Sequence, residues 1–311
     1  MALDEATTAF MERLAATGAK PVHESEVDEA RLASQAKIAL FGEGPQMHAV
    51  YQRSVPSTAS QNVRLRILVP THSPDRVVLY FHGGGWVLGD IEGFDTLGRK
   101  LAAASNSVVV LVDYRKAPEN PYPAAVEDAW AALNWAAHEL AALLGGPRPI
   151  VVAGDSAGGN LAAVMCLRAR AAGGPRIAQQ LLVYPVVDCD LNTESYLAPE
   201  NQLAIGRDAM EWFWNHYATP DRRTEPEASP LRCADLSGLP PAVVITAEHD
   251  PLRDEGEAYA EALRCAGVPV LAKRFEGQMH GFFTLVNILP GSDSGLEFLT
   301  DALTTSPIPA E

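Results

Sequence analysis

A strand-to-helix junction at residues 150–160 constrains the fold of this chain more than any other stretch. An apolar run at 150–153 leads into Gly-Asp-Ser-Ala-Gly, and an alanine-rich helical stretch follows. A serine at the tip of such a turn has a strained backbone, so glycines are needed two positions before and after it, where a Cβ atom would strike a neighbouring element. Gly154 and Gly158 meet this need. The pattern predicts a nucleophile elbow with Ser156 as the nucleophile.

A glycine-rich loop upstream supplies a second element of the same chemistry. Residues 77–81 predict a buried strand that leads into the sequence His-Gly-Gly-Gly-Trp at 82–86. Successive glycines at a strand end leave backbone N–H groups free to point into a cleft, as stabilisation of a tetrahedral oxyanion requires. The N–H that follows Ser156 lies at a helix N-terminus and suits the same role. The predicted oxyanion hole consists of Gly83, Gly84, Gly85 and Ala157.

An acidic residue and a histidine follow in the chain order expected of a Ser, Asp or Glu, His triad. The strand-like run at 242–246 is followed by Asp250, with Glu248 and Asp254 as weaker competitors. The next strand-like run is followed by His280 in a glycine-flanked loop. The predicted catalytic residues are therefore Ser156 as nucleophile, His280 as general base and Asp250 as the carboxylate that orients the imidazole.

The other histidines are assigned no catalytic role. His249 is the nearest competitor, but a residue beside Asp250 usually points elsewhere, whereas a histidine from a separate loop can approach both partners. His82 is expected to tie down the oxyanion loop by hydrogen bonding, and Asp155 to anchor that loop or a cap. Five histidines have no supporting motif and are expected to be structural or on the surface: His23, His48, His72, His138 and His216.

Strand-like and helical stretches alternate along most of the 311 residues. Strands are expected at 63–69, 77–81, 108–112, 150–153, 181–184, 243–246 and 268–275. Helices are expected at 97–104, 124–144, 161–172, 255–266 and 296–303. This alternation predicts an α/β fold, with a mostly parallel central sheet covered by helices on both faces.

The chain resembles the hormone-sensitive-lipase-like branch of the α/β-hydrolase carboxylesterases. The segments that carry the resemblance lie at 82–86, 113–119, 123–128, 154–160, 250–255 and 280–282. The resemblance spans nearly the whole chain and implies an α/β-hydrolase fold with a helical cap. Lys116, Asn120 and Tyr122 depart from it, because Leu, His and Phe are more usual there. These departures concern substrate preference and not the chemistry.

Two segments lie outside the alternation, and the resemblance implies that both form a cap over the acyl pocket. The predicted organisation is an N-terminal cap segment at 1–50, a first part of the catalytic domain at 51–185, an inserted cap segment at 186–230 and a second part of the catalytic domain at 231–311. The insertion carries the aromatic cluster from Trp212 to Trp214. Simple helix packing also explains at least one of those rings.

Charge and cysteine usage restrict the partners. The net charge of −15 argues against nucleic acid and anionic membrane surfaces as partners and is compatible with a neutral substrate, here a small-molecule ester. The main role expected of the acidic surface is solubility or salt tolerance. Residues 1–20 are acidic where a signal peptide is basic and then apolar, so a cytoplasmic location is expected. The four cysteines have no paired spacing, so neither a zinc site nor a disulfide framework is indicated. No cofactor or metal is expected, and a homodimer is one assembly that the sequence leaves open.

These features predict a serine carboxylesterase that hydrolyses short- to medium-chain acyl esters through an acyl-enzyme intermediate. An amidase or a lactonase would share the same acyl-enzyme step and stays an alternative. A non-enzymatic small-molecule receptor is a further alternative, since plant relatives of this branch bind a hormone in the former active site. That receptor class has lost the histidine that this chain retains as His280.

Overall fold

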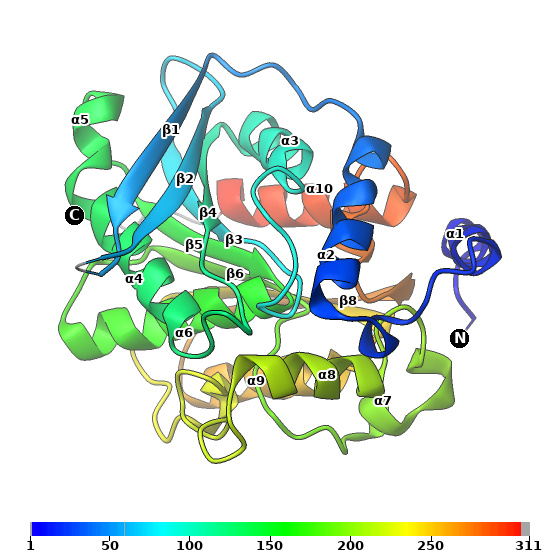
Figure 1. The fold of residues 1–311 in the computed structure, drawn as a ribbon. Coiled ribbons are helices and arrows are strands. Elements are labelled where there is room, and N and C mark those ends of the chain that lie inside the picture. The colour runs from blue at the N-terminus through cyan, green and yellow to red at the C-terminus, as the bar shows by residue number, and fades with distance from the viewer. Residues whose placement is uncertain (1, 59, 306–311) are drawn as a thin grey trace.

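A sheet of eight strands forms the centre of the computed structural model, which describes residues 2–58 and 60–305. The strand order is β1-β2-β4-β3-β5-β6-β7-β8 (Figure 1). The pairs β1–β2 and β2–β4 are antiparallel, and every other neighbouring pair is parallel. The predicted α/β class with a mostly parallel sheet is confirmed. The strands are β1 (Ala49–Pro56), β2 (Asn62–Val69), β3 (Arg76–Phe81), β4 (Ser107–Asp113), β5 (Ile150–Asp155), β6 (Gln179–Val183), β7 (Ala242–His249) and β8 (Val270–Met279).

The central strands are buried along their whole length, because helices cover both faces of the sheet. Every residue of β3, β5 and β6 is buried, which explains their nearly continuous apolar sequences. The chain places β4 on one side of β3 and β5 on the other. The chain therefore turns one way after β3, towards β4, and the other way after β5, towards β6. Loops that diverge in this manner leave a crevice at the carboxyl ends of β3 and β5. Phe81 of β3 pairs with Gly154 of β5, so the loops that follow them lie side by side.

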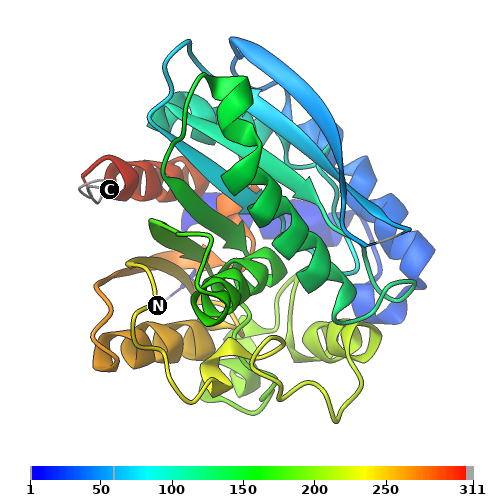
Figure 2. The ribbon, with the colours of Figure 1, turned by 90° about the vertical axis from the view of Figure 1, so that its left-hand side faces the viewer.

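Side chains of β3 alternate between two cores. Val77 and Leu79 pack with α4, α6 and α9, whereas Val78 and Tyr80 pack with α3 and α10. Figure 2 shows α4 and α6, in green, in front of the sheet. The helices of the two layers are α3 (Asp95–Ser105), α4 (Ala124–His138), α5 (Leu140–Leu144), α6 (Ala157–Ala172), α9 (Arg253–Cys265) and α10 (Pro290–Thr305).

Two elements differ from the sequence prediction. Strand β1 was not expected, because it is an edge strand in which only Val55 is buried, and its exposed polar residues hide the strand pattern. The single helix expected at 124–144 is divided at Glu139 into α4 and α5. Neither difference affects the carboxyl edge of the sheet.

The two predicted cap segments are helical in part. One precedes the sheet, and the other lies between β6 and β7; helix α8 of the second contacts η1 of the first. In Figure 1 both occupy the side of the molecule away from α5. Their boundaries as cap segments remain a prediction. Their elements are α1 (Glu5–Ala16), η1 (Val22–Glu24), α2 (Val27–Ala36) and η2 (Ile38–Phe41), then α7 (Glu194–Leu197), η3 (Pro199–Asn201), α8 (Arg207–Tyr217) and η4 (Pro230–Arg232).

Candidate active site

Ser156 stands at a sharp turn between β5 and α6 with a strained backbone. Its φ of +54° and ψ of −120° are uncommon for a residue with a side chain, and such strain clusters at functional sites. Its N–H donates to the carbonyl of Val183 over 2.9 Å, which ties the turn to β6. A Cβ atom at Gly158 would overlap the carbonyl of Phe81, and one at Gly154 would overlap the backbone of Gly158. The turn therefore has room only for glycine at both positions.

The side chains predicted as a triad are brought together in one hydrogen-bonded chain. His280 Nε2 lies 3.1 Å from Ser156 Oγ, and His280 Nδ1 lies 2.8 Å from Asp250 Oδ2. The Asp250 side chain is fully buried, and its Oδ1 accepts the N–H of Leu252 over 2.8 Å. A carboxylate beside Nδ1 holds the proton there, which leaves the Nε2 lone pair directed at the serine hydroxyl.

The topology explains why residues so far apart in sequence meet. Asp250 follows β7 and His280 follows β8, and these two strands are parallel neighbours whose carboxyl ends lie at one edge. The N–H of His280 donates to the carbonyl of His249 over 3.3 Å, which fastens the two loops together. The ring of Tyr184, at the end of β6, lies 4.6 Å from the His280 ring and limits its movement.

The glycine-rich loop after β3 lies beside Ser156, and its first glycine is already engaged. The N–H of Gly83 donates to Asp155 Oδ1 over 3.0 Å, and the hydroxyl of Tyr80 donates to the same oxygen over 2.9 Å. In the described part of the chain, the N–H groups of Gly84 and Gly85 make no hydrogen bond. The N–H of Ala157, the first residue of α6, has no acceptor within its helix. Among the four predicted oxyanion donors, Gly83 therefore differs from the other three, because its N–H already has an acceptor.

Burial raises the pKa of Asp155 to about 6, although the hydrogen bonds from Tyr80 and Gly83 favour its charged form. The carboxylate is therefore mainly ionised at pH 7 but sensitive to mild acid. Its position between the elbow and the glycine-rich loop fits the anchoring role expected from the sequence.

His82 is buried under the same loop. Its Nδ1 lies 2.8 Å from the carbonyl of Gly83, and its ring stacks on Tyr114 with ring centroids 4.3 Å apart. Burial lowers the pKa of His82 to about 4, so the ring is neutral at pH 7 and its Nδ1–H can donate to the Gly83 carbonyl. This contact matches the expected loop-tying role.

The competing carboxylates of the acid loop have other partners. Asp254 Oδ2 accepts the N–H of Ser195 over 2.7 Å, and Glu248 Oε2 accepts the N–H of Gly277 over 2.8 Å. Two contacts from the insertion were not foreseen. Ser195 Oγ donates to the carbonyl of Pro251 over 2.6 Å, and Asn201 Nδ2 lies 3.4 Å from the carbonyl of Asp250. Neither residue belongs to a motif, so no sequence signal indicated them.

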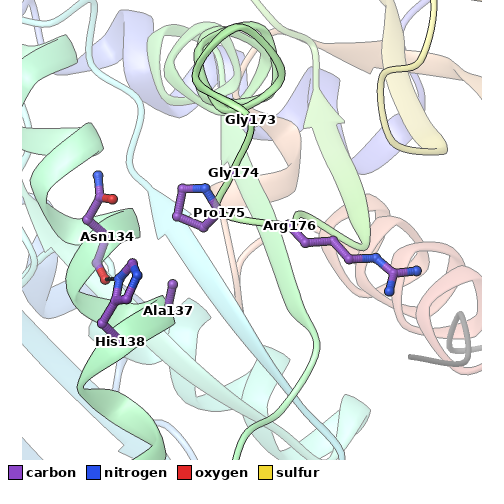
Figure 3. Close-up of a pocket in the computed structure, with 7 residues that line it drawn as sticks. All are labelled: Asn134, Ala137, His138, Gly173, Gly174, Pro175 and Arg176. Atoms are coloured by element: carbon purple, nitrogen blue, oxygen red, sulfur yellow. Dashed lines mark hydrogen bonds between the residues drawn. The ribbon is translucent and has the colours of Figure 1, made fainter.

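A cavity of about 390 Å³ lies where α6 ends, beside Gly173 and Gly174 (Figure 3). Helix α6 starts beside the serine and ends at Ala172, and a helix of 16 residues is about 24 Å long. This cavity is therefore remote from the candidate triad. Among the described residues, no group of three His, Cys, Asp or Glu side chains could hold a metal ion, and no helix has the length and apolarity to cross a bilayer. The cavity is lined by Asn134, Ala137, His138, Gly173, Gly174, Pro175 and Arg176.

Comparison with known proteins agrees with this geometry. Residues 78–284 match a family described by its alpha/beta hydrolase fold. The chain is 41% identical to carboxylesterase NlhH of Mycobacterium tuberculosis over 249 residues, which cover 78% of each protein. It is 33% identical to an ethyl acetate hydrolase of Pseudomonas putida, over 91% of each protein. A hyperthermophilic esterase of the archaeon Pyrobaculum calidifontis superposes with a TM-score of 0.90 and 38% identity, over 98% of this chain and 99% of that one.

The family match covers most of the chain, and relatives named carboxylesterase or esterase match this chain over more than three quarters of their own length. The chain therefore belongs to the α/β-hydrolase family, in its carboxylesterase branch that resembles hormone-sensitive lipase.

Proposed function

We propose that this protein is a serine carboxylesterase that acts on esters of short to medium acyl chains. One observation carries the proposal: the hydrogen-bonded chain from Asp250 through His280 to Ser156 ends beside backbone N–H groups that have no partner among residues 2–58 and 60–305. This arrangement joins a nucleophile, a general base and donors for a developing negative charge, which acyl transfer needs together.

The proposed reaction has two steps. His280 Nε2 takes the hydroxyl proton as Ser156 Oγ attacks the ester carbonyl, and the N–H groups of Gly84, Gly85 and Ala157 stabilise the oxyanion. The imidazolium then gives this proton to the leaving alcohol, and an acyl-serine ester remains. Water, deprotonated by His280, attacks that ester; the bond between the acyl carbon and Ser156 Oγ breaks, His280 returns its proton to Oγ, and the acid leaves. Asp250 orients the imidazole and stabilises its charge. Gly83 is left out of the hole because Asp155 engages its N–H.

The preference for short to medium chains rests on the insertion. Its Phe213, Trp214 and Tyr217 side chains pack against the glycine-rich loop beside the site. Its surface carries charged side chains rather than an extended apolar face, among them Glu194, Arg207 and Glu211. The relative from Pseudomonas putida is named for a short ester, ethyl acetate. Each buried methylene adds about 0.8 kcal/mol of binding until the pocket ends, so activity should rise with chain length and then stop rising abruptly.

A series of p-nitrophenyl esters tests the proposal. We expect maximal kcat/KM at an acyl chain of about four to eight carbons, and turnover lower by roughly 10⁴ to 10⁶ in the Ser156→Ala variant. A fluorophosphonate should label the wild-type protein and leave Ser156→Ala unlabelled. A maximum at palmitate, or activation by emulsified triolein, would instead indicate a true lipase. An unlabelled wild-type protein would favour the receptor alternative.

The cytoplasmic location is part of the proposal. The four cysteines are all free thiols, which is compatible with a reducing compartment. Localisation of a tagged chain in cell fractions would test it, and recovery in an oxidising compartment would contradict it.

A further inference from the structure

The loop that carries the candidate oxyanion donors has a left-handed backbone at consecutive residues. Its φ angle is +113° at Gly84, +58° at Gly85 and +59° at Trp86. Glycine adopts such angles easily, but tryptophan does so rarely, and a strained backbone persists only where its surroundings impose it. The contacts of Trp86 therefore help to determine where the two preceding N–H groups point.

Trp86 is packed against aromatic side chains of α8, in the inserted segment. Its ring stacks on the ring of Tyr217 with centroids 3.9 Å apart and an interplanar angle of 3°. The ring of Trp214 lies 5.0 Å from it at 55°. All three side chains are fully buried. The side chain at the end of the glycine-rich loop is thus oriented by a helix that is distant in sequence.

The same face of α8 also covers Gly85. A Cβ atom at Gly85 would overlap the ring of Phe213, so this backbone lies directly against that ring. Phe213, Trp214 and Tyr217 follow Met210 at a spacing of three, four and seven residues, which places all four side chains on one face of the helix. That face of α8 packs directly against the oxyanion loop, at Gly85 and Trp86.

The ring of Tyr217, rather than its hydroxyl, makes these contacts. Its hydroxyl oxygen has no hydrogen-bond partner among the described residues. Its carbonyl accepts the N–H of Tyr122 over 2.7 Å, and the two rings meet edge to face with centroids 5.6 Å apart. Tyr122 therefore fixes the position of Tyr217, and the ring of Tyr217 in turn packs against Trp86.

We infer that Tyr217 is a positioning residue for the oxyanion hole. Its ring holds Trp86, and through Trp86 it fixes the N–H groups of Gly84 and Gly85 where the oxyanion forms. This inference rests on the proposed function, because it requires acyl transfer at Ser156. Donors of this kind stabilise a transition state only when they are fixed beforehand, and a displacement of about 1 Å can slow a reaction roughly 100-fold. The insertion then contributes to the chemistry and does not merely cover it.

Three variants of α8 test this role. Tyr217→Leu removes the stacked ring, and Tyr217→Phe keeps the ring and removes only the unpartnered hydroxyl. Trp212→Leu is a matched control on the same helix, because Trp212 is half-buried and contacts His216 and Phe213 rather than Trp86.

For each variant, fluorophosphonate titration counts the active sites, and p-nitrophenyl butyrate gives kcat and KM. A trifluoromethyl ketone gives an inhibition constant. In its complex Ser156 Oγ bonds to the carbonyl carbon, the hydroxyl proton passes to His280, and the former carbonyl oxygen becomes an oxyanion.

We expect Tyr217→Leu to lower kcat per active site about 10- to 100-fold while KM changes less than about threefold. The inhibition constant of the ketone should rise by a similar factor, because the ketone complex needs the same N–H donors. Tyr217→Phe and Trp212→Leu should keep kcat within about twofold of the wild type.

A folded Tyr217→Leu variant with wild-type kcat and inhibition constant would overturn the inference, as would a rise in KM alone. If circular dichroism shows that this variant does not fold, Phe213→Leu makes a smaller change on the same face. Phe213→Leu must then lower kcat and raise the inhibition constant of the ketone together. Wild-type values of both would again overturn the inference. A wild-type protein that neither hydrolyses esters nor reacts with the fluorophosphonate would contradict the proposed function itself, before any variant is compared.

Discussion

The two segments beside the candidate site are attached to the sheet in different ways. Helix α2 of the N-terminal segment buries only Ala30, and the side chains of Leu32 and Leu40 nearby are 67% and 63% exposed. Helix α8 of the insertion buries five residues, and four of these form the apolar face of α8 that packs on the oxyanion loop. Regions with few buried apolar contacts open at a lower free energy than the core. The insertion is thus part of the core, whereas helix α2 of the N-terminal segment is attached through fewer buried residues.

Polar contacts provide much of the attachment of the N-terminal segment. The Arg31 guanidinium donates to the carbonyls of Val87 and Ala117 over 3.1 and 2.9 Å, and to both carboxylate oxygens of Glu119. This pairing lowers the pKa of Glu119 to about 2, so the ion pair persists in mild acid. We expect access to the site to depend on movement of this segment, whereas the insertion sets the geometry of the reacting groups.

The sharpest test of the comparison is at the acid loop, which the insertion contacts through Asp254. Asp250→Asn should lower kcat by about 10⁴, because an amide no longer holds the correct tautomer of His280. Asp254→Asn should lower kcat less than about tenfold, since its carboxylate bonds to Ser195 and Arg253 and not to His280. Both variants are measured on one p-nitrophenyl ester. An inactive Asp254→Asn variant beside an active Asp250→Asn variant would reverse the assignment within this loop.

The difference in burial predicts a large contrast in stability. Trp214→Ala should reduce the free energy of unfolding by about 3–5 kcal/mol, because it leaves a cavity against Trp86 and Tyr217. Leu32→Ala should change the same free energy by less than about 0.5 kcal/mol, because its side chain is mostly exposed. Urea denaturation of both variants measures the contrast. Similar losses in the two would show that the segments are equally part of the core.

Release of the N-terminal segment should be local. Arg31→Ala should speed proteolytic cleavage within residues 2–45 about fivefold, because roughly 1 kcal/mol of local attachment is lost. The global unfolding midpoint in urea should stay unchanged. Arg13→Ala is the control, since Arg13 is also a cation of this segment but is exposed. If Arg31→Ala lowered the global midpoint and left the cleavage rate unchanged, the segment would belong to the same cooperative unit as the insertion.

The smallest predicted effect concerns the opposite side of the oxyanion loop, where the sheet holds it through Asp155. The folded-state pKa of Asp155 is raised from 3.8 to about 6, so the native protein binds this proton more readily than the unfolded chain. This group therefore favours folding more as the pH falls through 6 towards 4. Between pH 8 and pH 5 its contribution should improve by about 1 kcal/mol, and Asp155→Asn should lack that part of the pH dependence. Urea unfolding at both pH values measures it, and equal pH dependence in both proteins would contradict the assignment.

The parts of the site that could be predicted from the sequence are those that directly follow a strand of the sheet. Ser156 and Asp250 follow buried strands, whereas His280 follows β8, an edge strand that is exposed over much of its length. Parallel strands bring all three ends to one edge of the sheet. The central strands were recognisable because burial on both faces makes them continuously apolar. Edge strand β1 was not recognisable, since exposure removes that signal.

What could not be predicted depends on contacts between distant segments. The sequence analysis expected Asp155 to act as an anchor, yet it kept Gly83 among the oxyanion donors. The structure shows that the anchor engages that very N–H. The bonds from Ser195 and Asn201 to the acid loop link positions 56 and 49 residues apart, and no periodicity indicates such pairs. The stacking of Tyr217 on Trp86 is of the same kind.

The position of His280 directly after the last strand has a consequence for folding. A chain that emerges from the ribosome N-terminus first presents the glycine-rich loop, the nucleophile and the acid before β8 has been synthesised. Such a partial chain can form most of the sheet, but it has no base beside the serine. Pairing of β8 with β7 joins residues close in sequence, whereas the site spans the chain from Gly84 to His280. Recovery of hydrolysis during refolding would therefore report when His280 reaches Ser156, 124 residues away in sequence, and not the earlier collapse of the core.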